Sequence, residues 1–397
     1  KSVAFHNTMV DRITSQRPDS NGLVPRAEPT PAKALVIEDL KNDLPQELST
    51  SNSKDNENEL ESKYGVVVRT KPGQLNSDIA LKLRVANGTH TAVAHVMALC
   101  QLLMTDVLSK TGGDNDSAST ILMKFLDSFF HNQIAKGVEA NKQQLISTTI
   151  DDAAYVYDDW RKRLIHAHFG LSSFFITQNG AAKGGIRIGP TVVDLLMNGQ
   201  NVSCATVFAL AAILRFLTPA RSMSTPDDGV YRGWLDGCAR DGDGNGGKSV
   251  EYADGLSYNL KEGWYEFRCA CNVIAGECER EQPLPVVLGS LPTTMQPPYY
   301  EQIIRAYLTK GDGGDLSKVA DHPCTKDSFG ILVRAVATVY ARMIAGDGML
   351  NILREMELES NCDTLVDGLE VSSNSKKRSN SHLDDYRPLH YRQNAIP

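Results

Sequence analysis

The sequence lacks a long apolar run. No stretch approaches the ~20 consecutive apolar residues that cross a bilayer. Nor does the chain open with the charged segment, apolar core and small-residue cleavage site of a secretory signal. These two absences predict a cytoplasmic protein without a membrane partner.

Clustered positive charge and paired cysteines are also missing. The formal net charge is −7 and no basic stripe is present, which argues against a nucleic-acid partner. The eight cysteines have no recurring Cys-x-x-Cys spacing, and Cys269, Cys271 and Cys278 share no segment with His166 and His168. We therefore expect reduced thiols and no metal site.

Strand-like runs are few, and they lie near the start of the chain. The runs "SVAFHN" (2–7), "KALVIED" (33–39) and "YGVVVRT" (64–70) predict strands, because short apolar runs, rich in β-branched residues in the last two, are bounded by turn residues. The polar run 47–62 between the last two has no apolar face and predicts a mobile insertion. Since "KSVAF" already resembles the middle of a strand, we expect the sequence to begin inside a domain.

Helical periodicity dominates from residue 77 onward. Apolar residues recur at helical spacing over 77–108, with Ser77 or Asp78 as the expected N-cap. Further helices are expected over 118–138, 142–165, 190–218, 297–309 and 328–358. The Gly- and Asp-rich segment 219–263 predicts a surface insertion. The predicted fold is mainly α, with a strand-containing part (1–75), a helical domain (76–360) and a disordered tail (361–397).

Three polar residues, Lys82, Asn87 and His90, interrupt the first long helix. At ~100° per residue, Asn87 lies about 140° and His90 about 80° from Lys82, so all three share one side of the helix. Gly88 costs a helix about 1 kcal/mol relative to alanine, which suggests a close approach to the backbone there. Spacing alone leaves two alternatives: groups that act on one substrate oxygen, or a helix end with a core histidine.

The run "KLRVANGTH" (82–90) resembles the signature of the polyol-specific long-chain dehydrogenases, the family of mannitol 2-dehydrogenase, mannitol-1-phosphate 5-dehydrogenase and the hexuronate reductases. The runs "NTMVDRIT" (7–14), "ALVIED" (34–39) and "QNGAAKGG" (178–185) resemble three further regions of the family, in the same order. The resemblance covers residues 1–100 and 150–220. It implies a helical substrate domain preceded by strands that complete a Rossmann-type domain, most of which would precede Asp11.

The resemblance also implies the roles of the catalytic residues. Lys82 would be the general base, and Asn87 and His90 would donate hydrogen bonds to the reacting oxygen. NAD or NADP would accept the hydride, and no metal would be needed.

Substrate-binding roles follow from the same resemblance. Asp11 and Lys183 would contact the remaining hydroxyls of the substrate, or a phosphate in the case of Lys183. The family usually has an arginine two turns before this lysine. Phe175 stands there instead, so Arg187 is the candidate replacement.

No residue is assigned to the cofactor. The run "GDGNGG" (242–247) satisfies the dinucleotide fingerprint, but no strand leads into it and acidic residues surround it. The same region misses the calcium-loop pattern by one position, because Glu251 stands at its eleventh residue rather than its twelfth.

The resulting hypothesis is a monomeric NAD(P)-dependent oxidoreductase that interconverts a sugar alcohol, mannitol or mannitol 1-phosphate, and its ketose. Two alternatives stay open. One is a non-catalytic helical interaction module, and the other is a fructuronate- or tagaturonate-type hexuronate reductase. The sequence does not distinguish NAD from NADP.

Overall fold

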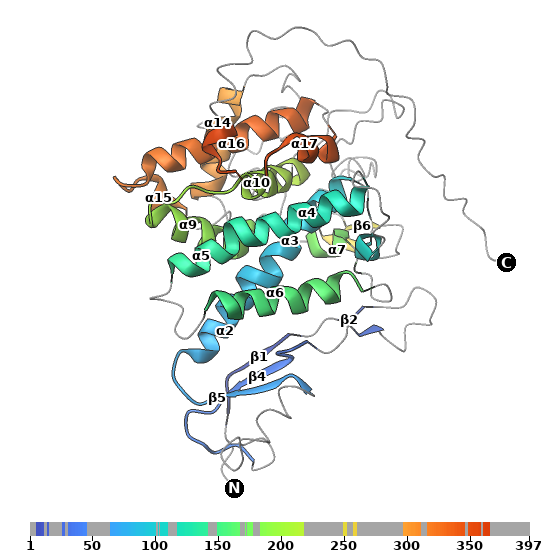
Figure 1. The fold of residues 1–397 in the computed structure, drawn as a ribbon, viewed down its shortest axis with the longest axis vertical. Coiled ribbons are helices and arrows are strands. Elements are labelled where there is room, and N and C mark those ends of the chain that lie inside the picture. Colours follow the sequence, from blue (N-terminus) through green and yellow to red (C-terminus); the bar gives the residue numbers. More distant parts are fainter. Residues whose placement is uncertain are drawn as a thin grey trace, which may run out of the picture.

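The computed structural model describes residues 5–11, 14–15, 26–27, 31–45, 64–100, 102, 104–109, 117–141, 149–166, 171, 173–177, 183–217, 249–251, 257–259, 297–310, 316–345, 348–358 and 360–365. The expected insertion at 47–62, the glycine fingerprint at 242–247, the three cysteines at 269–278 and the tail beyond residue 365 lie outside these ranges. In the described part the fold is mainly α with a small sheet, as predicted (Figure 1).

The sheet lies at one end of the molecule (Figure 1). Its strands are β1 (Thr8–Val10), β4 (Leu35–Glu38) and β5 (Val66–Arg69), in the order β1-β4-β5. The first pair is antiparallel and the second is parallel. Met9, Val36 and Val67 form a small apolar cluster with Leu75 of the following helix, so the sheet is covered on that face.

The strands predicted at 33–39 and 64–70 are confirmed by β4 and β5, whereas the first prediction is displaced. Residues 2–4 of that run lie outside the described ranges. Residues 5–7 belong to no strand, although the Asn7 carbonyl accepts from the Glu38 N–H, and the Phe5 side chain is 92% exposed. The strand begins at Thr8, where Met9 supplies the buried residue. Two short pairs complete the β-structure: β2 (Thr14–Ser15) with β3 (Arg26–Ala27), and β6 (Ser249–Glu251) with β7 (Ser257–Asn259).

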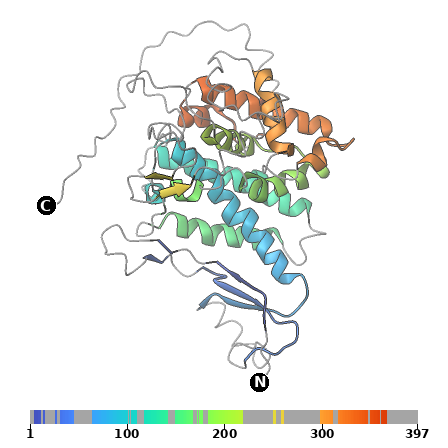
Figure 2. The same cartoon turned by 180° about the vertical axis from the view of Figure 1, so that it is seen from behind.

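A continuous helix leaves the sheet and runs into the helical body (Figure 2). It consists of α2 (Gln74–Lys82), a π-helical turn η2 (Leu83–Asn87) and α3 (Gly88–Leu99). The predicted N-cap, Ser77 or Asp78, is wrong, because the helix begins about one turn earlier. The cap is Gly73, in the left-handed conformation at φ 85°, and the Ser77 hydroxyl donates back to its carbonyl at 3.1 Å.

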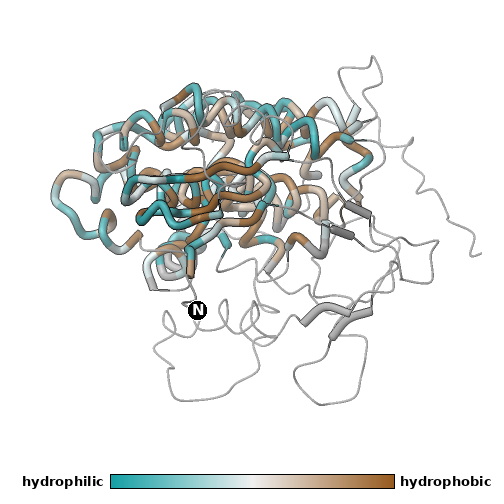
Figure 3. The backbone as a smooth tube through the Cα atoms, turned by 90° about the horizontal axis from the view of Figure 1, so that it is seen from below, coloured by the Kyte–Doolittle hydropathy of each residue, from teal (hydrophilic) through white to brown (hydrophobic). Residues whose placement is uncertain are grey.

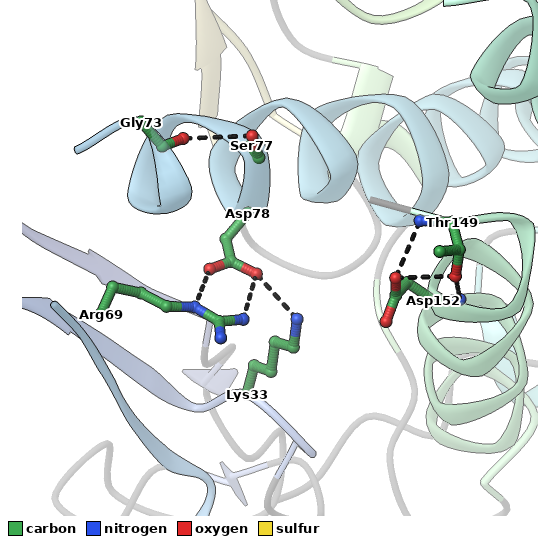
Figure 4. Close-up of polar contacts among 7 residues, drawn as sticks. All are labelled: Lys33, Arg69, Gly73, Ser77, Asp78, Thr149 and Asp152. Atoms are coloured by element: carbon green, nitrogen blue, oxygen red, sulfur yellow. Dashed lines mark hydrogen bonds and ion pairs between the residues drawn. The ribbon is translucent and has the colours of Figure 1, made fainter. Parts of the chain in front are cut away.

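Asp78 is used for an ion-pair cluster instead of a cap (Figure 4). Its carboxylate accepts from the Arg69 guanidinium at 2.7 and 3.0 Å and from Lys33 Nζ at 2.7 Å. Burial raises the pKa of this carboxyl, but hydrogen bonds and charge from Arg69 and Lys33 outweigh burial and lower it overall. The cluster ties α2 to the end of β5 and to the segment before β4.

The remaining helices form the helical body together with α3. They are η3 (Thr105–Ser109), α4 (Ala118–Phe129), η4 (Phe130–Ile134), α5 (Ala135–Ala140), α6 (Ile150–Leu164), α7 (Ser173–Thr177), η5 (Gly184–Ile188), α9 (Gly189–Met197), α10 (Cys204–Leu217), α14 (Pro297–Lys310), α15 (Ser317–Ala320), α16 (Lys326–Ala345) and α17 (Met349–Glu355). η3 is a 3₁₀ helix, and η4 and η5 are π-helical turns like η2. A capping box between Thr149 and Asp152 starts α6 (Figure 4).

The main core lies around α10, which packs against α3 and α16. Almost every residue of α10 is apolar and buried, as expected for a helix that is surrounded by others. Apolar segments accordingly gather inside the helical body (Figure 3). No helix in the described ranges is long and apolar enough to span a bilayer.

Two predicted helices are each divided into two. The helix expected over 190–218 stops at Met197, where Gly199 takes φ 68°, and restarts at Cys204. The helix expected over 328–358 stops at Ala345 and restarts at Met349 after Gly348. Periodicity persists across both breaks, so it could not reveal them.

The helical body also extends past the expected boundary at residue 360. The Cys362 side chain is 1% exposed and its N–H donates to the Val202 carbonyl at 2.8 Å. The Cys204 N–H in turn donates to the Ser360 carbonyl at 2.9 Å. Residues 361–365 therefore pack against the start of α10.

Candidate active site

Lys82 is the last residue of α2 and lies where β1 ends. Its Nζ donates to the Val10 carbonyl at 2.6 Å and lies 3.1 Å from Asp11 Oδ1. The two side chains are 22% and 16% exposed, so both are half-buried and still reachable from solvent. Two residues predicted for the site, from segments far apart in the sequence, are thus in direct contact.

The second oxygen of Asp11 is also occupied. Arg163 Nη2, from α6, lies 3.2 Å from Asp11 Oδ2, and Arg163 Nε lies 3.1 Å from Asp159 Oδ2. Asp159 further accepts from the Ala32 N–H at 3.3 Å. Because both Asp11 oxygens are in ion pairs, this carboxylate holds other protein groups in this structure, although the sequence predicts that it contacts a substrate hydroxyl.

Arg163 was not predicted from the sequence, although a signal for it exists. The buried positions Ala153, Tyr157, Trp160 and Leu164 form one stripe along α6. Arg163 borders this stripe, and its side chain is only 6% exposed. An arginine beside the apolar stripe of an amphipathic helix is a candidate for a buried ion pair.

His90 is buried near the start of α3. It is 7% exposed, and its Nε2 has no hydrogen-bond partner in the described part of the chain. Burial, together with the charges of Arg187, Lys183 and Arg163, lowers the pKa of His90 to about 3. The imidazole is therefore neutral near pH 7 and can donate from one ring nitrogen only.

Asn87 ends η2 and is half-buried, and none of the described residues hydrogen-bonds its side chain. The π-helical turn also corrects the angular argument from the sequence. Residues 83–87 do not advance by the α-helical ~100° each, so the predicted angles between Lys82, Asn87 and His90 are wrong. Lys82 and His90 are linked instead through Arg163. This residue pairs with Asp11 beside Lys82, and its charge acts on His90.

Lys183 directly precedes η5 and contacts α7, whereas Arg187 lies on η5 and contacts α3. Lys183 Nζ donates to the Ile176 carbonyl at 2.6 Å, and Arg187 Nη1 donates to Thr91 Oγ1 at 2.9 Å. Burial, with help from the Arg187 charge, lowers the pKa of Lys183 to about 8, and burial lowers the pKa of Arg187. Within the described ranges neither cation has a carboxylate partner. The Phe175 backbone lies in α7, and its side chain lies outside the described atoms.

Gly88 lets the backbone of η5 approach the start of α3 closely. A Cβ at this position would lie 3.2 Å from the Arg187 carbonyl oxygen. The η2 turn contacts both η5 and η4, so three π-helical turns meet here. The Thr89 hydroxyl donates to the Val85 and Ala86 carbonyls at 2.5 and 3.2 Å, which supports the irregular turn. The backbone approach expected from the sequence is therefore made by η5.

A second buried histidine of α3, His95, was also missed. It is fully buried, its Nδ1 lies 2.7 Å from the Thr91 carbonyl, and its Nε2 has no partner among the described atoms. Burial lowers the pKa of His95 to about 3, although the Thr91 carbonyl opposes this, and Lys183 and Arg187 add to the lowering. Its spacing from His90 is not that of any metal or catalytic motif, so no sequence pattern selects it.

One group in the described part has the composition of a metal site. Ligand atoms of His6, Asp39 and Asp43 lie within 4.8 Å of one another. However, both Asp39 oxygens already accept backbone N–H groups, from Asp43 at 3.1 Å and Leu44 at 3.4 Å. Asp39 thus stabilises the turn after β4, and we assign no metal to it.

Comparisons with known proteins find similar solved structures but no family. No family model matches the sequence, and no significant match is found among curated proteins. Two solved structures are similar at low identity. A D-sorbitol dehydrogenase in substrate-free form has 15% identity and a TM-score of 0.38, with 54% of this chain and 40% of that chain covered. A Pseudomonas fluorescens mannitol 2-dehydrogenase, in a ternary complex with NAD and D-mannitol, has 12% identity and a TM-score of 0.45, with 89% and 55% covered.

The chain thus spans about half the length of these proteins or less. At these identities and TM-scores the comparisons assign neither a family nor an activity to the chain.

Proposed function

We propose that the chain forms the substrate-binding and proton-transfer part of an oxidoreductase that interconverts a sugar alcohol and its ketose, with NAD or NADP as hydride acceptor. The observation that carries the proposal is the half-buried Lys82 amine at the end of β1, with the neutral, buried His90 further along the same continuous helix. The resemblance of residues 82–90 to the polyol-dehydrogenase signature predicts these residue types at this spacing. Mannitol and mannitol 1-phosphate are the first substrates to test.

The proposed proton transfer uses Lys82 as the base. In its neutral form the amine takes the proton of a secondary hydroxyl while the hydrogen on the same carbon leaves as hydride, so that the C–O bond becomes a carbonyl. The Asn87 amide and one His90 ring N–H donate to the oxygen as it gains alkoxide character. In the reverse direction the Lys82 ammonium returns the proton to the oxygen.

A bound nicotinamide would accept or donate the hydride, but the described residues do not form a site for it. The direct strand-to-helix connection from β5 to α2 has a single glycine, Gly73, in its turn. A dinucleotide fold needs a glycine-rich turn that leads into a helix N-terminus. No cofactor contact is therefore assigned.

Lys183 and Arg187 support a substrate with an anionic end. Both are largely buried and lack a carboxylate partner among the described residues, and their charge acts on His90. A phosphate or carboxylate at the far end of the substrate would supply the missing negative charge. A hexuronate reductase is therefore the second candidate. Its substrate carboxylate needs a cation, and Arg187 offers one in place of the arginine that the family usually has at the position of Phe175.

The test is turnover by the full-length gene product with mannitol, mannitol 1-phosphate and hexuronates, each with both nicotinamide cofactors. Lys82→Ala should lower turnover of the accepted substrate by at least ~10²-fold, the lower end for loss of a general base. The variant should melt close to the parent, because the amine is half-exposed. Lys71→Ala, which removes an exposed lysine just before α2, is the matched control and should retain activity.

Full activity in Lys82→Ala would assign the lysine a structural role and contradict the proposed mechanism. An absence of turnover with every substrate in the parent would favour the non-catalytic interaction module.

A comparison of substrates tests the anionic end. Arg187→Met and Lys183→Met should raise KM more for mannitol 1-phosphate or a hexuronate than for mannitol. Equal effects on neutral and charged substrates would exclude an anion at these cations.

A further inference from the structure

We propose that Arg163 is a positioning residue of this site: by occupying the second oxygen of Asp11, it fixes the place of the Lys82 amine and makes its proton easier to remove. The proposal rests on the function proposed above for Lys82.

Arg163 differs from its neighbours on α6. The Arg161 side chain is 33% exposed and pairs with Asp127, whereas the Arg163 side chain is 6% exposed and lies on the side that faces the sheet end. A buried guanidinium is costly unless its donors are used. Here Nε is used by Asp159 at 3.1 Å and Nη2 by Asp11 at 3.2 Å.

Asp11 transmits the position of Arg163 to Lys82. Its backbone N–H donates to the Ala34 carbonyl at 2.9 Å, so the residue is fixed against β4. Its two carboxylate oxygens are shared, with Oδ1 on Lys82 at 3.1 Å and Oδ2 on Arg163 at 3.2 Å. Together with the Val10 carbonyl, this carboxylate determines where the Lys82 amine lies.

The charges of Asp11 and Arg163 have opposite effects on how easily the Lys82 amine loses its proton. Asp11 alone would stabilise the Lys82 ammonium and so oppose loss of its proton. The positive charge of Arg163 on the opposite oxygen compensates much of that attraction. Removal of Arg163 should leave the carboxylate fully available to the ammonium and make the amine a poorer base.

The other charged and titratable groups on the elements packed near Lys82 either have partners of their own or lie on α3 and at η5. They are Asp159 on α6; Asp78 with Arg69 and Lys33 on the sheet side; Arg84 of η2 with Asp194 of α9; and His90, Lys183 and Arg187 on the α3 side. Among the ion pairs within the described ranges, only Asp11 pairs with Lys82.

The test is the pH dependence of Lys82 acylation by acetic anhydride, read peptide by peptide with mass spectrometry, since only the neutral amine reacts. In Arg163→Met the pH of half-maximal rate at Lys82 should rise by about one unit, the lower end for an opposite charge that is no longer compensated. Arg163→Lys keeps the positive charge, so its pH of half-maximal rate should lie close to that of the parent. Asp11→Asn should move the midpoint the other way.

Arg161→Met is the matched control, because it removes an arginine–aspartate pair from the same helix without contact to Asp11. It should leave the Lys82 midpoint unchanged. A parent-like midpoint in Arg163→Met, or an equal shift in both variants, would overturn the proposal. Should Arg163→Met not fold, Arg163→Gln decides on the same readout.

This measurement separates the proposal from the function on which it rests. If the parent turns over no polyol, the proposed function fails, yet the acylation midpoints still decide whether Arg163 acts on Lys82. If the parent is active, the basic limb of its turnover–pH profile should move with the acylation midpoint in Arg163→Met.

Discussion

Two histidines of α3 are neutral for the same physical reason. His90 and His95 are both buried beside Lys183 and Arg187, and burial lowers each pKa to about 3. An unfolded chain protonates histidine near pH 6.5. Between about pH 3 and pH 6.5 the unfolded state therefore binds two protons that the folded state does not.

The consequence is a loss of stability as the pH falls. Each histidine should lower the free energy of unfolding by about 1.4 kcal/mol per pH unit below ~6.5. Chemical denaturation at pH 7 and pH 5 should show this decrease in the parent, and His95→Leu should reduce its slope by about half. His131→Gln, at an exposed histidine, should change nothing. An unchanged slope in His95→Leu would mean that this ring is already protonated in the folded state.

At the residue scale, the sequence identified most of one cluster. Lys82 and Asp11 were selected by motif, and they are in contact although 70 positions of chain separate their segments. Arg163 was not selected, because three basic residues stand together in "WRKR" and only the packing of α6 tells which of them is buried. Whether Asn87 joins Lys82 at one oxygen remains a prediction.

At the scale of elements, the approach of η5 to α3 depends on a glycine. Gly88 leaves room for the Arg187 carbonyl, whose oxygen would lie 3.2 Å from an added Cβ. Gly330, in the interior of α16, has no such neighbour, since the nearest atom is the flexible end of Arg334 at 3.6 Å. An alanine at Gly330 therefore tests helix propensity alone, whereas an alanine at Gly88 also tests the packing of η5 against α3.

Alanine at these two positions should have different effects on stability. Gly330→Ala should raise the free energy of unfolding by about 0.5–1 kcal/mol, the gain expected from helix propensity. Gly88→Ala should give no gain or a loss, since η5 must move, so the two variants should differ by at least ~0.5 kcal/mol. Equal stabilisation in denaturant titrations would show that α3 and η5 separate at little cost.

Helix boundaries were the least predictable elements. Ser77 and Asp78 are good N-cap residues by type, yet Arg69 and Lys33 pair with Asp78 from the sheet, and α2 begins one turn earlier at Gln74. The division of 190–218 depends on Gly199 at φ 68°. Such tertiary contacts and backbone angles are not encoded in local periodicity.

At the scale of the whole molecule, the helical body incorporates residues far apart in the sequence. Residues 360–365 pack against Val202 and Cys204 through backbone hydrogen bonds and the buried Cys362 side chain. The sequence predicted the mainly α fold and the two strands β4 and β5, because period and β-branching are local signals. It placed the limit of the body at residue 360, because five mixed residues have no detectable period.

Truncated chains measure how much residues 361–365 contribute to the free energy of unfolding. A chain that ends at Leu365 should unfold within about 1 kcal/mol of the full chain, because the sequence beyond it has too few apolar residues to predict a packed segment. A chain that ends at Ser360 should lose about 2–3 kcal/mol, from the hydrogen bond of the Cys362 N–H to Val202, the hydrogen bond of the Cys204 thiol to the Asn361 carbonyl and the buried Cys362 side chain. Thermal melts of the two truncated chains compare them directly. Equal stability would show that 361–365 contributes nothing.

The π-helical turn between Lys82 and His90 gives this helix a place where one residue can be lost without a change in its course. A π turn closes its hydrogen bond one residue later than an α turn, so it contains one residue more. Deleting one residue within 83–87 would let the whole segment become regular α-helix without breaking it. The α turn completes about the same rotation with one residue fewer, so everything downstream would keep about its direction relative to Lys82. Such a deletion should therefore leave His90 and Thr91 beside the cations of η5 and change only the side chains of the turn itself.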